Sequence, residues 1–158
     1  MAAWNPWRAL RGMEVDLWFA ALGGPRGLWT RTGGRDEILI EQSLGRRERR
    51  EVLAHELVHA ERGIGWPLAT AATMQLEEER VWRIALRRLA PPAQVEEFLR
   101  RRATVGPVSL EDLAEEFDLT LDGAARVAGL LALGGGCAGS EVGFVHPEAV
   151  EAEGHPDG

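Results

Sequence analysis

The chain has 158 residues, 45% hydrophobic and 27% charged, which suits one ordinary domain with a buried core and is too short for two large ones. Its formal net charge is −7, and its single cysteine, Cys137, excludes an internal disulfide and favours a reducing, cytoplasmic location. No apolar run is long enough to cross a membrane, and the first residues lack the apolar stretch of a secretory signal, so no membrane partner is expected.

The charge is unevenly distributed along the sequence. Residues 1–110 contain 17 arginines and 14 acidic residues, whereas residues 111–158 contain one arginine and 11 acidic residues. The acidic end would repel a polyanion, so nucleic acid is not the expected partner.

Residues 1–45 predict one short helix and three strands. Asn5-Pro6 can cap and start a helical turn that ends near Arg11. Strand-like patterns follow, separated by glycine-rich turns, at residues 14–19, 28–31 and 37–41. Connections this short favour an antiparallel meander.

The next segment, from about Gly45 to Arg62, predicts a helix that contains the pentad His55-Glu56-Leu57-Val58-His59. Helical residues four apart lie roughly 40° apart in projection, so both imidazoles can reach one tetrahedral ion. Glu56 lies about 100° from His55, where it can take a proton from an attacking water as a general base. The alternative is a pair of solvent-exposed histidines, but an apolar stripe on the other side of the helix favours a metal site.

A catalytic zinc usually takes three protein side chains, and the nearest further candidates are Glu77, Glu78 and Glu79. They begin a predicted helix that runs from Glu77 to about Ala90. Glu78 falls in the apolar stripe of this helix, whereas its two neighbours point to the sides. An acidic first turn that suits the helix dipole would explain three glutamates together, but not one on the buried side. Glu78 is therefore the favoured third ligand, and Glu79 is the next candidate.

The C-terminal half predicts three more helices and a tail. The helices cover about residues 94–102, 109–117 and 121–133, and an acidic, flexible tail is expected over residues 134–158. The last two helices, joined by a short turn within residues 105–133, have the shape of a DNA-reading helix-turn-helix motif. The second of them has only Asp122 and Arg126 as charged residues, so it cannot pair many phosphates or base edges, and a packing role is expected.

The segment after the pentad resembles that of a known family. Its residues fall at the spacing Glu-x-x-Ala-x-x-Phe-Ala-x-x-Leu-Leu-Met-Pro, which follows the His-Glu-x-x-His helix in ImmA/IrrE-like metallopeptidases. The matching positions are Glu78, Val81, Ile84, Ala85, Leu89 and Pro91. The resemblance covers about residues 36–133, with isoleucine in place of the usual aromatic residue and Arg88-Leu89-Ala90 in place of Leu-Leu-Met.

This resemblance implies a small α+β, zincin-like metallopeptidase domain over residues 1–133. His55, His59 and Glu78 would be the Zn²⁺ ligands, and Glu56 would be the general base. It also implies that the helix-turn-helix-like segment belongs to the protease unit. The strand before the metal helix, Asp36–Gln42, is the candidate edge that pairs with extended substrate, although it could equally be a sheet that only backs the helix.

The expected function is therefore hydrolysis of a peptide bond in a cytoplasmic protein, and by the resemblance the substrate is a helix-turn-helix repressor. The chain has no tyrosine, so an arginine or His146 is left to stabilise the developing oxyanion. The alternative is a non-catalytic regulatory or DNA-binding module that keeps a zincin shell. The sequence leaves open whether the native metal is zinc or another divalent ion.

Overall fold

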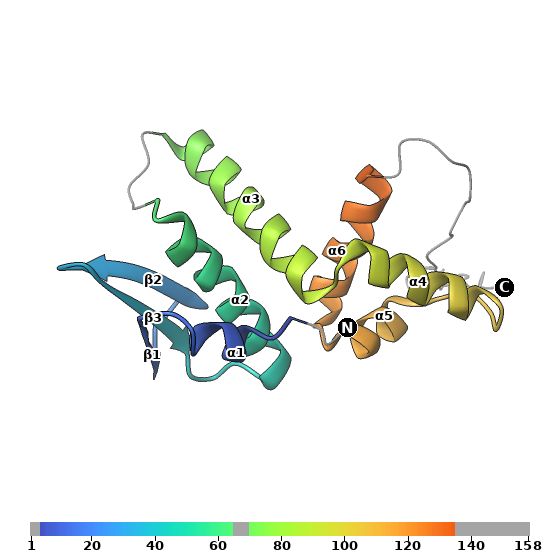
Figure 1. The fold of residues 1–158 in the computed structure, drawn as a ribbon, viewed down its shortest axis with the longest axis horizontal. Coiled ribbons are helices and arrows are strands. Elements are labelled where there is room, and N and C mark those ends of the chain that lie inside the picture. Colours follow the sequence, from blue (N-terminus) through green and yellow to red (C-terminus); the bar gives the residue numbers. More distant parts are fainter. Residues whose placement is uncertain (1–3, 65–69, 135–158) are drawn as a thin grey trace, which may run out of the picture.

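The computed structural model describes residues 4–64 and 70–134, and it confirms the expected α+β class (Figure 1). The predicted tail, including His146, lies outside the described residues. In the described part, no helix is both long and apolar enough to cross a bilayer. The elements in chain order are α1 Pro6–Leu10, β1 Val15–Ala20, β2 Gly27–Thr32, β3 Arg35–Glu41, α2 Arg46–Arg62, α3 Ala71–Leu89, α4 Pro92–Ala103, α5 Leu110–Phe117 and α6 Leu121–Gly134.

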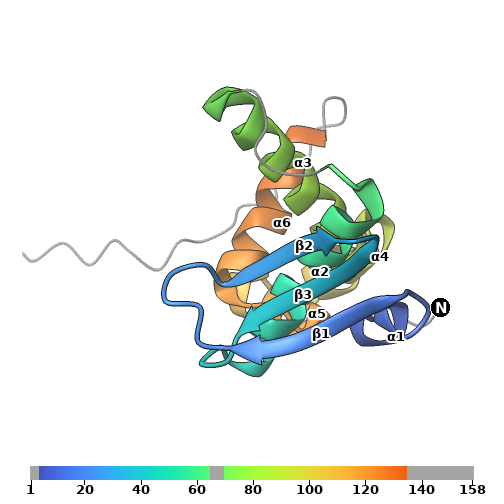
Figure 2. The same cartoon turned by 90° about the vertical axis from the view of Figure 1, so that its left-hand side faces the viewer.

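The three strands exist as predicted, but the antiparallel meander is wrong. The strand order is β1-β3-β2, with β1 parallel to β3 and β2 antiparallel to β3 (Figure 2). Gly33 and Gly34, both with positive φ, make the tight turn between β2 and β3. The central strand is β3, where Ile38 and Ile40 are fully buried, and this order requires the chain to pass from β1 to the far edge before it returns.

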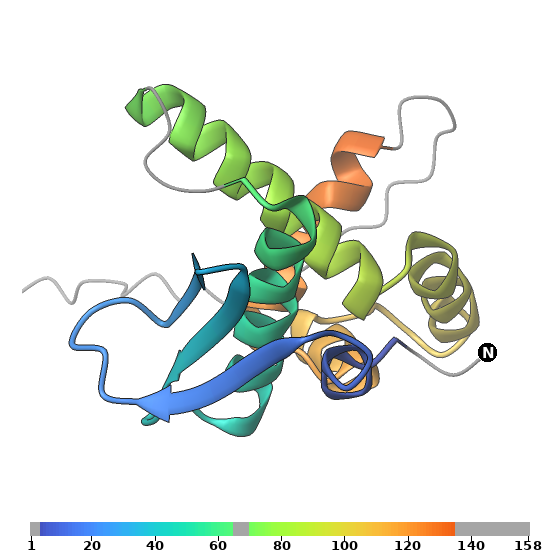
Figure 3. The ribbon, with the colours of Figure 1, turned by 60° about the vertical axis from the view of Figure 1, so that its left-hand side comes forward.

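Helix α2 lies between the sheet and α3 (Figure 3). Leu53 and Leu57 pack with the sheet, whereas Ala54 and Val58 pack in a second core with α3. The sequence analysis expected only one packed side, but every residue from Glu51 to Ala60 is buried. The helix ends at Gly63, whose φ of 62° is the left-handed conformation that favours glycine at this position.

Helix α3 begins before the predicted start at Glu77. Thr70 caps it, and Thr70 and Thr73 exchange hydrogen bonds between side chain and backbone in a capping box. The prediction placed the start at the acidic cluster, just before the apolar pattern, and missed the threonine cap upstream. The observed boundary instead follows the threonine cap, so the acidic residues lie inside the helix.

The C-terminal helices agree with the prediction. Ser109 caps α5, and Ala124 and Val127 of α6 are buried in the core that α6 shares with α3 and α5. Helix α6 therefore contributes one side to this core.

The first turns of α2 are attached to the turn between α5 and α6. Arg46 and Arg47 form ion pairs with Asp118, and Arg50 donates to the carbonyl oxygens of residues 117 and 118. The buried Glu51 carboxylate accepts hydrogen bonds from the backbone N–H and the hydroxyl of Thr120 at 2.6 and 2.9 Å. Two segments far apart in the sequence are thereby joined by side chains of one helix.

Candidate metal centre

The structure brings together His55 and His59 from the middle of α2 and Glu78 from α3. Each histidine Nε2 faces one oxygen of the Glu78 carboxylate, at 3.1 Å for His55 and 3.0 Å for His59. The two Nε2 atoms are themselves 3.1 Å apart. Both histidines are buried, and the Glu78 side chain is 35% exposed, so the group lies at the floor of an opening.

These donor atoms can hold a metal ion. A tetrahedral zinc with ligands about 2.0–2.1 Å away separates neighbouring ligand atoms by roughly 3.3 Å, which is close to the observed spacing. Two imidazole nitrogens and one carboxylate oxygen also form a donor set typical of catalytic zinc. The identity of the ion remains a prediction.

Two tryptophans pack against the two histidines of the site. The Trp82 ring lies against the His55 ring, with centroids 4.3 Å apart, and Trp29 stacks on His59 with centroids 6.5 Å apart. The buried Nδ1 of His55 has no hydrogen-bond partner among the residues that the structure describes. The contact of Nε2 with Glu78 and the packing against Trp82 therefore hold the orientation of the His55 ring.

The ionisable groups of the site change one another's pKa values. Hydrogen bonds from His55 and His59 lower the pKa of Glu78 to about 2. Burial lowers the pKa of His55, whereas for His59 the hydrogen bond to Glu78 and the nearby carboxylates outweigh burial and raise the pKa. A Glu78 side chain that stays ionised is a ready ligand for a cation.

Glu56 lies in the same small cleft as the three ligands. The cleft has a volume of about 150 Å³. Its lining residues are Gly27, Leu28, Trp29, His55, Glu56, His59 and Glu78. Burial raises the pKa of Glu56 to about 7, against the opposing charge of His59. The predicted general base therefore shares the cleft with all three predicted ligands.

Gly27 of β2 is a site residue that the sequence analysis missed. A Cβ atom at this position would overlap the Val52 side chain and lie 2.6 Å from Glu56 Oε1. A glycine beside a strand pattern indicates close approach of another group, and here that group is Glu56. The absence of a side chain at Gly27 leaves the space that Glu56 occupies.

We expect Gly27→Ala to lower the free energy of unfolding by about 1–3 kcal/mol, because the added methyl group overpacks the contact with α2. The control is Gly24→Ala, since a Cβ there meets nothing within 4 Å. Urea unfolding of both variants measures the difference. Equal stability of the two variants would show that α2 moves away from β2 at little cost.

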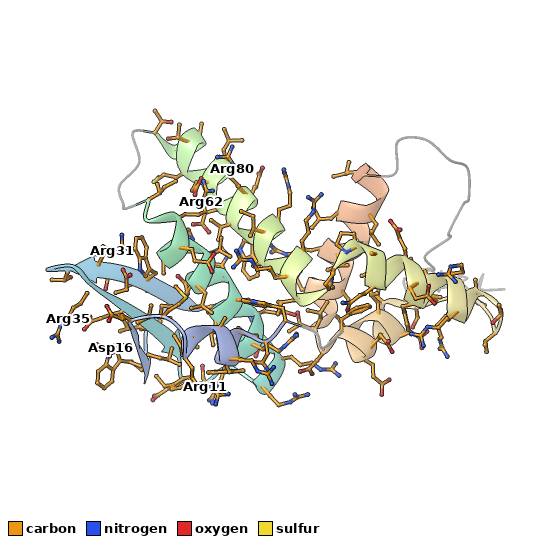
Figure 4. The ribbon with its side chains drawn as sticks, in the orientation of Figure 1. Arg11, Asp16, Arg31, Arg35, Arg62 and Arg80 are labelled. Atoms are coloured by element: carbon orange, nitrogen blue, oxygen red, sulfur yellow. The ribbon has the colours of Figure 1, made fainter. Side chains whose placement is uncertain are left out.

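Glu77 is the second residue that the sequence analysis misplaced. The prediction placed the Glu77 side chain at the side of the helix. In the structure this side chain is buried and forms a two-point ion pair with Arg62 at the end of α2. Figure 4 labels Arg62 between α2 and α3. Because Glu77 directly precedes Glu78, this pair fixes the rotation of α3 about its axis and thereby the direction of Glu78. A search for metal ligands alone would not reveal this role.

We expect Glu77→Ala to lower the free energy of unfolding by about 2 kcal/mol, because it leaves the Arg62 guanidinium without its charged partner. The matched control is Glu61→Ala, which removes the more exposed Glu61–Arg88 ion pair between the same two helices and should cost less than about 1 kcal/mol. Thermal or urea unfolding compares them. A larger loss from Glu61→Ala would contradict the importance given to burial.

The prediction of which strand forms the edge beside the metal helix is wrong. Residues 36–42 were the candidate, but β3 is central and pairs with a strand on each side. Among the described strands, β2 is the edge that lines the cleft, through residues 27–29. The prediction followed closeness in the sequence to the metal helix, whereas the central position of β3 follows from its pairing with both other strands.

No arginine lines the cleft itself in the described ranges, 4–64 and 70–134. Arg126 lies nearby: it packs over the Trp82 ring at 5.0 Å, and its charge contributes to lowering the pKa of His55. The oxyanion-stabilising group therefore stays a prediction.

Neither a scan against models of protein families nor a search of the curated proteins finds a match to this chain.

Proposed function

We propose that the protein is a zinc-dependent metallopeptidase. The observation that carries this proposal is the convergence of His55, His59 and Glu78 in a cleft that also holds Glu56. Burial raises the pKa of Glu56 to about 7, which suits a group that exchanges protons beside a metal-binding site. The resemblance to ImmA/IrrE-like metallopeptidases supports the same assignment.

The roles of the residues follow from their positions. The bound zinc would polarise a peptide carbonyl and activate water. His55, His59 and Glu78 hold the ion, and the packing of both histidines against tryptophans limits their rotation. Glu56 takes the proton from the attacking water and returns it to the leaving amine. The sheet and α2 exclude bulk water from the back of the site.

Strand β2 suits the binding of an extended peptide. It pairs with β3 on one side, and its residues 27–29 line the cleft. An edge strand presents backbone N–H and C=O groups that a peptide can pair with as a further strand. The substrate main chain would then run past the metal site along β2.

The substrate is proposed to be a cytoplasmic protein, and the resemblance points to a transcriptional repressor of the helix-turn-helix kind. The burial of Ala124 and Val127 in α6 supports a structural role for the chain's own helix-turn-helix-like segment. Direct DNA binding is therefore not part of the proposed function.

The test is metal analysis of the purified protein after dialysis, followed by incubation with a pool of unstructured peptides and mass spectrometry of the products. We expect one zinc per chain. We also expect new peptide termini that are not formed when a chelator is present during the incubation. A metal-free folded protein with salt-dependent DNA binding would instead support the non-catalytic regulatory module.

A further inference from the structure

A second, larger hollow adjoins the metal centre. It lies between α3 and α6, which pack together near α4 and diverge toward the start of α3 and the end of α6 (Figures 1 and 3). Its volume is about 500 Å³. Its apolar walls are formed by Trp82, Leu86, Leu130 and Leu133. We call this hollow the α3–α6 groove.

The α3–α6 groove is continuous with the metal centre through two residues. Glu78 lines both the groove and the cleft. Trp82 forms a wall of the groove and packs against the His55 ring. A molecule bound through the metal can therefore extend directly into the groove.

We propose that the α3–α6 groove receives an apolar side chain of the polypeptide substrate, next to the peptide bond that is cleaved. This inference rests on the proposed function and adds to it the chemical class of the preferred substrate. The side chain is of leucine, methionine or phenylalanine type, because the groove walls are mostly apolar and its volume exceeds that of one such side chain.

The walls leave room for such a group. Leu133 is 87% exposed at the end of the groove. Gly129 of α6 is exposed, and a Cβ atom there would meet nothing within 4 Å. Two arginines, Arg83 and Arg126, and two glutamates, Glu78 and Glu79, line the groove, so it has no excess of one charge that would select an acidic or a basic side chain.

The test uses two short peptide hydroxamates that differ only in having leucine or glycine next to the hydroxamate, a group that chelates zinc. Calorimetry on the zinc-loaded protein should show that the leucine compound binds on the order of tenfold tighter or more, the usual gain from burying one leucine side chain. Gly129→Phe fills the groove, so it should remove this preference while zinc content and binding of the glycine compound stay unchanged. Ala125→Phe is the control, since Ala125 is exposed on the same helix but does not line the groove.

Equal affinity of both compounds for the wild-type protein, or a leucine preference that survives Gly129→Phe, would overturn the proposal. Sedimentation of the wild type and of Gly129→Phe tests whether a second copy of the chain occupies the groove instead. If the wild type is a dimer that Gly129→Phe dissociates, and the leucine preference is unchanged, the groove is an interface between copies. Cleavage of peptides without any leucine preference would contradict the groove and leave the metallopeptidase intact. A leucine preference in a zinc-loaded protein that cleaves no peptide would support the groove and contradict the metallopeptidase.

Discussion

Replacing Glu56 by glutamine should abolish peptide cleavage while the protein keeps its zinc and its fold. Glutamine is nearly isosteric and still donates and accepts hydrogen bonds, but an amide cannot take a proton from water near neutral pH. The expected loss in kcat is roughly 10²–10⁴-fold, the usual contribution of a positioned general base. The measurement is the rate of cleavage of the best peptide from the pool, with metal analysis of the same sample.

His55→Ala is the informative comparison for Glu56→Gln, because it should remove both activity and zinc. Glu56→Gln retains all three ligands, whereas His55→Ala leaves two. Full activity of Glu56→Gln would refute the proposed base even if zinc were bound. Loss of zinc from Glu56→Gln would show that this side chain maintains the site rather than moving protons.

Replacing Glu78 by alanine should weaken zinc binding by at least about 100-fold, because it removes one of three protein ligands. Glu79→Ala should change zinc affinity little. Glu79 is exposed and accepts a hydrogen bond only from Gln75 among the described residues, at 3.1 Å. Titration of each metal-free variant with zinc, in competition with a chromophoric chelator, measures both affinities.

Equal losses from the two variants, or a greater loss from Glu79→Ala, would mean that α3 is rotated relative to the described position. The ion pair of Glu77 with Arg62 makes this outcome testable in a second way, since Glu77→Ala should then leave the free energy of unfolding unchanged. Agreement of the three variants with these expectations would establish the orientation of α3 in solution.

The local parts of the site were predictable from the sequence. The spacing of His55 and His59 and the phase of Glu78 depend only on helical periodicity, and the structure places these three residues together. The α+β class agrees with the run of strand patterns that precedes the run of helix patterns. The helix-turn-helix-like segment was also found, because its cap at Ser109 and its turn are local signals.

Long-range features were not predictable in the same way. The central position of β3 depends on competition between strands for the buried place in the sheet, so short loops gave the wrong topology. The start of α3 is set by the capping box of Thr70 and Thr73, which lies before the apolar pattern from which the helix was predicted. Gly27 and Glu77 have partners on α2, and no pattern along their own segments identifies Glu56 or Arg62 as those partners.

The attachment of α2 to the α5–α6 turn has a consequence for how the molecule can be divided. Glu51 lies one helical turn before His55, and its buried carboxylate is satisfied by Thr120. Removing α5 and α6 would leave that carboxylate without its donors and expose the apolar side of α3. The helix-turn-helix-like segment is therefore not a detachable module: a fragment that ended before it would lose the support of the helix that carries both histidines.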